Sequence, residues 1–186
     1  MTRAQDLANE IDAKVHELQA ELANPTPTET VVSTVDALNL ALSNGGTFRL
    51  SATGGDNGRY KGNFVVSKPT TLKADAGAML TPADQFTPTL QVKAGKTSLT
   101  ALGIENGAPD RECVVVGDFN ATSADAQPDG VLFDACVVTA GPKGGKRGIV
   151  LHGKNLSVMN TRVVNFWCAQ DFAVACPSVV PSRLKP

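Results

Sequence analysis

The sequence repeats a pattern of β-strands without repeating identical residues. Each copy has a short apolar strand, a gap, and a longer strand broken by a corner. Strand lengths are kept while gap lengths vary, as expected for stacked repeats with insertions in their turns. The pattern therefore predicts a solenoid with one narrow core, in which residues near 90, 114 and 149 are neighbours in one ladder. The three clearest copies occupy 89–93 with 97–106, 112–117 with 130–139, and 147–152 with 155–165.

A weaker first copy lies at 47–51, 63–67 and 70–74. A rival alignment sets 113–116 beside 136–139, but it matches a short strand with the second half of a long one, so we treat it as coincidence. Only 5% of residues are aromatic, and Val, Ala, Thr and Gly are abundant. This composition is typical of narrow β-repeats packed with β-branched side chains.

The N-terminal residues 1–24 show helical periodicity. Apolar residues recur at spacings of four and three, as in a coiled-coil seam, and fewer than three heptads need a partner for stability. We predict an oligomerisation or anchor segment, with a surface helix packed on its own domain as the alternative. Residues 25–32 form a linker rich in Pro and Thr, 33–176 the β-domain, and 177–186 an extended tail. The seam consists of Ala4, Ala8, Ile11, Val15, Leu18 and Leu22.

A short helix is expected directly after the linker. Ser33 with Asp36 resembles an N-cap pattern, and Gly45 with Gly46 supplies the stop. Its apolar face would cover the open end of the first repeat, which otherwise exposes core and strand edges. After Asn165 no such helix follows, so the tail, another repeat or another subunit is expected to cover that end. The apolar face contains Leu38, Ala41 and Leu42.

Charge and cysteine usage exclude several classes. The net charge is −1 without a basic stripe, so nucleic-acid binding is not expected. No apolar stretch is long enough to span a membrane, and the polar N-terminus is unlike a signal peptide, so synthesis in a cytoplasm is expected. The four cysteines form no CxxC pair, so we predict no metal site and no cofactor. Cys113 and Cys136 are expected to be buried core residues.

The segment 35–80 carries Gly45-Gly-Thr-Phe-Arg-Leu, Asn63-Phe-Val-Val-Ser and Gly77-Ala-Met-Leu. It resembles the opening of pectate-lyase-like right-handed parallel β-helix proteins, and 99–106 is similar to their strands. With the N-terminal helix, the chain further resembles bacteriophage tailspikes and fibres. The resemblance implies a mainly β chain, a right-handed parallel β-helix behind a short N-terminal helix or coiled coil. It also implies a homotrimer in a virion that binds or cleaves bacterial surface polysaccharide.

Catalysis on this fold would need outward carboxylates. Asp134 is the best single candidate, because it lies mid-strand near Asn160 of the next repeat, below the insertion 117–129. His152 is a candidate base without an identified acid. The catalytic patterns of the resembled superfamily are not recognisable here, so no catalytic residue is carried over from it.

The run Gly141-Pro-Lys-Gly-Gly-Lys-Arg-Gly lacks the order of a phosphate loop and precedes a strand, so we interpret it as a turn. Its cations are candidates for contact with an acidic sugar. Asparagines near corners are attributed to left-handed backbone; they are Asn106, Asn155, Asn160 and Asn165. The candidate glycan contacts are Asp118, Asp129, Lys143, Lys146 and Arg147.

The leading hypothesis is a structural, trimeric spike or fibre of a phage-like virion. Its N-terminal helix would attach to a tail, baseplate or capsid protein, and its β-helix would project toward a host glycan. The alternatives are a polysaccharide depolymerase, acting as a lyase or hydrolase, and a non-catalytic carbohydrate-binding module.

Overall fold

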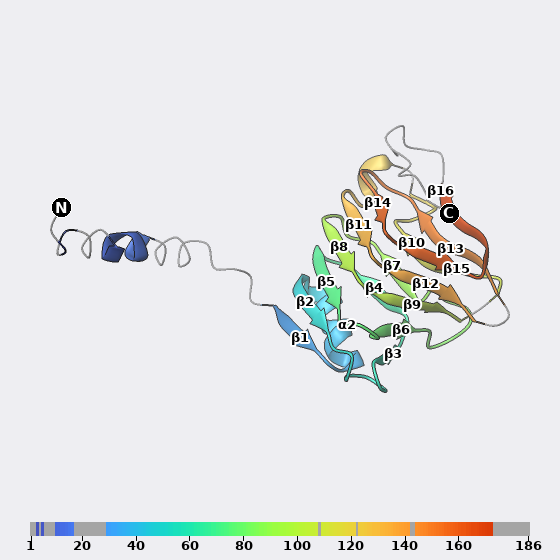
Figure 1. Cartoon of the computed structure of the whole chain (residues 1–186). Coiled ribbons are helices and arrows are strands. Elements are labelled where there is room, and N and C mark those ends of the chain that lie inside the picture. Colours follow the sequence, from blue (N-terminus) through green and yellow to red (C-terminus); the bar gives the residue numbers. More distant parts are fainter. Residues whose placement is uncertain are drawn as a thin grey trace.

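The computed structural model describes residues 3, 5, 10–16, 29–107, 109–121, 123–141 and 144–172. Within these ranges the chain is mainly β, with three parallel sheets of six, five and five strands (Figure 1). The first sheet contains β1 (Thr30–Val32), β2 (Gly46–Leu50), β5 (Thr70–Ala74), β8 (Thr97–Thr100), β11 (Val131–Asp134) and β14 (Ser157–Met159). The second contains β4 (Phe64–Val66), β7 (Leu90–Val92), β10 (Glu112–Val116), β13 (Gly145–Leu151) and β16 (Phe166–Phe172). The third contains β3 (Arg59–Lys61), β6 (Met79–Thr81), β9 (Gly103–Asn106), β12 (Val137–Ala140) and β15 (Arg162–Val164).

Strands follow one another in a fixed rotation among these sheets. From β2 onward the chain visits the first, then the third, then the second sheet, and from β5 onward each strand pairs in parallel with the strand three places earlier. This order is compatible with a β-solenoid. The predicted ladder is confirmed, because Val114 pairs with Leu90 on one side and with Ile149 on the other.

The predicted corners separate the first sheet from the third. Ala101, Ala135 and Asn160 occupy equivalent positions with φ of 56°, 53° and 49°. They divide the long strands into β8 and β9, β11 and β12, and β14 and β15. The rival alignment is excluded, because Cys113 lies in the second sheet whereas Cys136 immediately precedes a strand of the third.

Inward side chains form one continuous core along the sheets. In the first sheet, Leu72 aligns with Leu99 and Leu99 with Phe133, and all three are fully buried. In the third sheet, Ile104 aligns with Val138, and both are also fully buried. Each such side chain contributes roughly 2 kcal/mol through burial, so the stacked ladders account for the cohesion of the repeats.

Helix α2 (Val35–Asn44) covers the N-terminal end of this core. It packs against β1, β2 and β4, and its predicted apolar face is buried. Gly45 ends the helix at φ 76°, as predicted. The predicted N-cap is wrong by one residue: the hydroxyl of Thr34 accepts from the amide of Ala37, whereas the carbonyl of Ser33 accepts from Gly55.

Three further features differ from the sequence expectations. Strand β1 lies inside the predicted linker 25–32, since Thr30–Val32 pairs with β2. Strand β3 was not anticipated, because a glycine-rich turn separates it from β2. Asn106 is not in left-handed backbone but is buried in β9, where its side chain donates to the carbonyl of Arg111 at 3.3 Å.

The two ends of the chain are described in part. Residues 10–16 are helical and leave Ile11 and Val15 exposed. The seam positions Ala4, Ala8, Leu18 and Leu22, and the predicted tail 177–186, lie outside the described residues. After Asn165 the chain adds β16 beside β13, so a strand of another repeat follows the last corner. In the described part of the chain, no helix has the length and apolar character needed to cross a membrane.

Candidate functional site

A pocket of about 550 Å³ lies over the outward face of the second sheet. Its floor is formed by Gln91, Val115 and Val150, which are direct neighbours on β7, β10 and β13. The residues flanking Val115 in sequence, Val114 and Val116, face the core. The period-two alternation of a strand therefore directs Val115 outward into the pocket.

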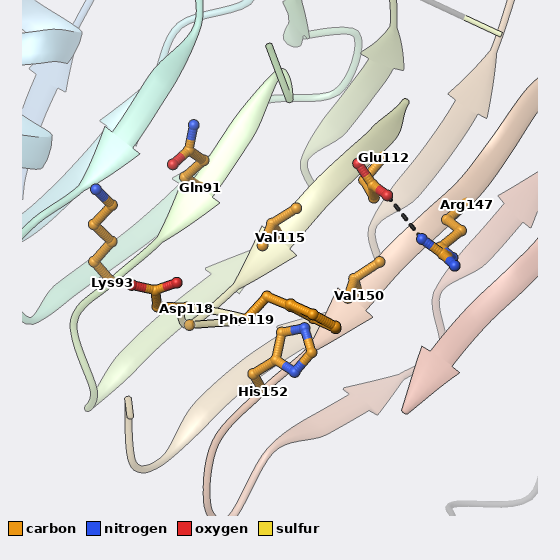
Figure 2. Close-up of a pocket in the computed structure, with 10 residues that line it drawn as sticks. Gln91, Lys93, Glu112, Val115, Asp118, Phe119, Arg147, Val150 and His152 are labelled. Carbon is orange, nitrogen blue, oxygen red and sulfur yellow. Dashed lines mark hydrogen bonds and ion pairs between the residues drawn. The ribbon is translucent and has the colours of Figure 1, made fainter. Parts of the chain in front are cut away.

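An ion pair borders the pocket where β10 and β13 begin. Nη1 of Arg147 donates to Oε1 of Glu112 at 2.9 Å (Figure 2). The two residues are neighbours in the strand register. Their side chains are 33% and 23% exposed, so they are partly shielded from water but remain accessible from the pocket.

An aromatic pair borders the opposite end of the pocket. The ring of Phe119 meets that of His152 edge to face, with centroids 5.4 Å apart and planes at 80°. His152 is 8% exposed, whereas Phe119 is 78% exposed. Figure 2 shows both rings across the valine floor from the Glu112–Arg147 pair. A large apolar ring held at the mouth of a polar pocket is a ready contact surface for a ligand.

Gly117 permits this arrangement. Its φ is +81°, and a Cβ atom at this position would lie 2.2 Å from the carbonyl oxygen of His152. Any larger residue would push apart β10 and the end of β13. Gly117 thereby lets the chain leave β10 directly above His152 and brings Phe119 over the ring.

Hydrogen bonds hold the insertion 117–129 that carries Phe119. The amide of Asp118 donates to Oε1 of Gln127 at 3.0 Å, and Nε2 of Gln127 returns a bond to the carbonyl of Asp118 at 2.6 Å. The amide of Asn120 donates to Oδ1 of Asp118 at 2.8 Å. Farther along, Nζ of Lys154 donates to Asp125 and lowers the pKa of that carboxyl group. The insertion is therefore held by bonds within itself around Phe119, and Lys154 ties it to the turn after β13.

The structure brings together some of the predicted site residues. Asp118, Arg147 and His152 line the pocket, whereas the exposed Lys146 does not. Asp129 accepts a hydrogen bond from Asn155 at 2.7 Å, in the turns between repeats. Lys143 lies outside the described residues.

Asp134 does not lie in the pocket. It is on β11 of the first sheet, where its neighbour Asn160 donates to Oδ1 at 2.9 Å. The expected proximity to Asn160 is confirmed, but the insertion 117–129 does not wall a cleft above Asp134, because it folds over the second sheet.

Four polar or aromatic residues of the pocket were not predicted from the sequence: Gln91, Lys93, Glu112 and Phe119. The sequence carries a signal for one of them, Glu112. The aligned copies place Glu112 opposite Arg147 as the first residues of equivalent strands, and opposite charges at neighbouring positions predict a pair.

The cysteines and metal-binding residue types point to no reactive centre in the described part of the chain. Cys113 and Cys136 are buried in the core, as predicted. Burial raises the pKa of both thiols, which disfavours the nucleophilic thiolate. Among the described residues, no group of three or more His, Cys, Asp or Glu side chains is placed to hold a metal ion.

Fold and site together define a mainly β protein with parallel sheets and, on one outward face, a pocket with an apolar floor, charged side chains and an aromatic border. No protein-family model, curated protein or solved structure matches the chain.

Proposed function

We propose that the chain is a right-handed parallel β-helix of the tailspike and fibre type. In this proposal it is a structural, trimeric component of a phage or phage-like virion, attached to a tail, baseplate or capsid protein by its N-terminal helix. Its second sheet presents the pocket to a glycan on the host surface. The rotation of strands among three parallel sheets supports the fold, and the exposed Ile11 and Val15 suit a helix that meets a partner.

The observation that carries the binding role is Phe119. Its ring is 78% exposed at the mouth of the pocket and is fixed by contact with His152 and by the bonds of its loop. Exposing a large ring costs free energy unless a ligand covers it. Saccharide rings have an apolar C–H face and a polar edge, and the pocket offers a complementary ring beside hydrogen-bonding side chains.

The positions of the carboxylates suit glycan binding better than glycan cleavage. Glycoside hydrolysis requires two carboxyl groups roughly 5 to 9.5 Å apart. Glu112 begins β10 and Asp118 follows its end, and the five steps from residue 112 to residue 117 span about 16 Å of extended strand. Glu112 is also paired with Arg147, and Asp134 is bonded to Asn160 on another sheet. We therefore propose a non-catalytic site.

Binding to immobilised bacterial surface polysaccharides tests the proposal. The wild-type chain should bind at least one of them, and Phe119→Ala should weaken binding about tenfold or more, a loss typical of one stacking contact. Phe86→Ala is the matched control, because Phe86 is 70% exposed on a loop outside the pocket. New reducing ends or unsaturated products would favour the depolymerase instead. Equal losses in both variants would contradict the assignment of the pocket.

The trimer is tested separately by the solution mass of the full chain. Light scattering should give three times 19.3 kDa, and a monomer at micromolar concentration would contradict the fibre assembly. Removing residues 1–24 should lower the number of chains in the assembly without abolishing glycan binding.

A further inference from the structure

The charges that line the pocket balance one another. Two cations, Lys93 and Arg147, face two carboxylates, Glu112 and Asp118. His152 adds charge only when protonated. Apart from His152, the charged side chains that line the pocket therefore carry no surplus positive charge.

The described residues of the basic run 141–148 do not change this balance. Residues 145–148 belong to β13 rather than to the predicted turn. The side chain of Lys146 is exposed and does not line the pocket, and Arg147 is paired with Glu112. Of the described cations that were predicted to contact an acidic sugar, Arg147 lines the pocket and Lys146 does not. The guanidinium of Arg147 is paired with Glu112.

From this balance we propose that the pocket is a subsite for a neutral saccharide unit, rich in hydroxyl groups and without a carboxylate or sulfate. The inference rests on the proposed glycan-binding function and specifies its ligand class. A hydroxyl group both donates and accepts hydrogen bonds. At the start of β10 and β13, the Glu112 carboxylate accepts and the Arg147 guanidinium donates side by side, which suits neighbouring hydroxyls of one sugar ring.

The remaining surfaces of the pocket match the rest of such a ring. Val115 and Val150 form an apolar floor, and the face of Phe119 attracts the weakly positive C–H groups of a sugar. The carboxylate of an acidic sugar, by contrast, would be brought near Glu112 or Asp118. Like charges at short range in a partly shielded pocket repel, so the same contacts that hold a neutral unit select against an acidic one.

Paired oligosaccharides test the inference. Hexamers of galactose and galacturonate with the same linkage are compared by calorimetry with the full chain, and glucose and glucuronate hexamers are compared likewise. We expect the neutral member of at least one pair to bind about tenfold more tightly than its acidic counterpart, the difference that 1.4 kcal/mol produces. Neutral binding should change little with salt, because no net charge is neutralised.

Two variants locate the preference. Asp118→Asn removes a carboxylate but keeps the oxygen that accepts from Asn120, so the acidic member should gain affinity relative to the neutral one. Lys146→Gln is the control and should leave the ratio of affinities unchanged. Circular dichroism and thermal unfolding check that both variants are folded.

Each outcome bears on one of the two proposals. Tighter acidic binding that is lost in Phe119→Ala would overturn the neutral subsite while leaving the glycan-binding function intact. No binding of any hexamer or surface polysaccharide would overturn both. Neutral binding that Phe119→Ala does not affect would place the ligand elsewhere and overturn the subsite.

Discussion

The side chain of Asn160 donates a hydrogen bond of 2.9 Å to the carboxylate of Asp134, its neighbour in the preceding repeat. Asn160 itself has φ of 49°, a left-handed conformation that asparagine tolerates better than most residues. The pair thus ties the corner at Asn160 to the end of β11 in the preceding repeat. Asp134 has a structural partner, which argues against its use as a catalytic group.

Asn160→Ala should therefore lower the free energy of unfolding by about 1 kcal/mol, because alanine is strained in left-handed backbone and cannot bond to Asp134. Chemical denaturation measures the change. Asn120→Ala is a suitable control, since Asn120 is exposed and has no positive φ. Equal stability of the two variants would show that the corner does not depend on Asn160.

Gly117→Ala should be more damaging than an ordinary surface change. The added Cβ meets the carbonyl oxygen of His152 at 2.2 Å, and φ is +81°. Strain and overpacking together should cost about 2 kcal/mol or more. Gly141→Ala is the matched control, because open space surrounds its Cβ position. Denaturation midpoints that agree within error would contradict the close approach of β10 and His152.

Strand stacking was predictable because the sequence reuses one strand pattern. The ladder through Val114 and the corners near Ala101 and Ala135 follow from aligning the copies. The first repeats were harder, since the turn before β3 is long and rich in glycine. Thr34 was missed as the N-cap because Ser33 and Thr34 both carry a hydroxyl group, and only backbone geometry separates them.

The pocket was predictable only in part. Alternation identifies outward positions such as Val115 and Val150, but the path of the insertion 117–129 decides which outward face is enclosed. That path depends on contacts between distant residues, such as Lys154 with Asp125. Asp134 was predicted as a candidate catalytic residue because the sequence shows a lone carboxylate in mid-strand. The loop that encloses the pocket lies over a different sheet.

The Glu112–Arg147 pair should contribute little to stability. Its side chains are about a quarter to a third exposed, so solvent screens their attraction. In a double-mutant cycle with Glu112→Gln and Arg147→Gln, we expect a coupling free energy below about 1 kcal/mol. A coupling several times larger would indicate a pair that holds the sheet together and has little capacity to bind a ligand.

Cys113 and Cys136 should resist alkylation in the folded protein. Both are buried and free, and burial raises the pKa of each thiol, so little thiolate is present or accessible at neutral pH. Iodoacetamide followed by peptide mapping should leave these two positions unmodified under native conditions and label them in denaturant. Rapid native labelling of Cys113 would contradict its place in the core.

Tyr60 should make stability depend on alkaline pH. It is fully buried, and its hydroxyl donates to the carbonyls of Ser51 at 2.8 Å and Val32 at 3.1 Å. Burial raises the pKa of Tyr60, so the folded state holds the proton to higher pH than the unfolded state does. The resulting stabilisation is complete below the unfolded pKa of about 10 and is lost as pH rises toward the folded pKa.

Tyr60→Phe should cost about 1 kcal/mol at neutral pH through the lost hydrogen bond. Above about pH 10 the wild-type free energy of unfolding should fall more steeply than that of the variant, so the two curves converge. The buried thiols are common to both proteins and cancel in this comparison. Tyr60 is the single tyrosine of the chain, so tyrosinate absorbance follows its ionisation directly. Parallel stability curves, or native ionisation at the pH of an unfolded tyrosine, would refute its burial beneath β1.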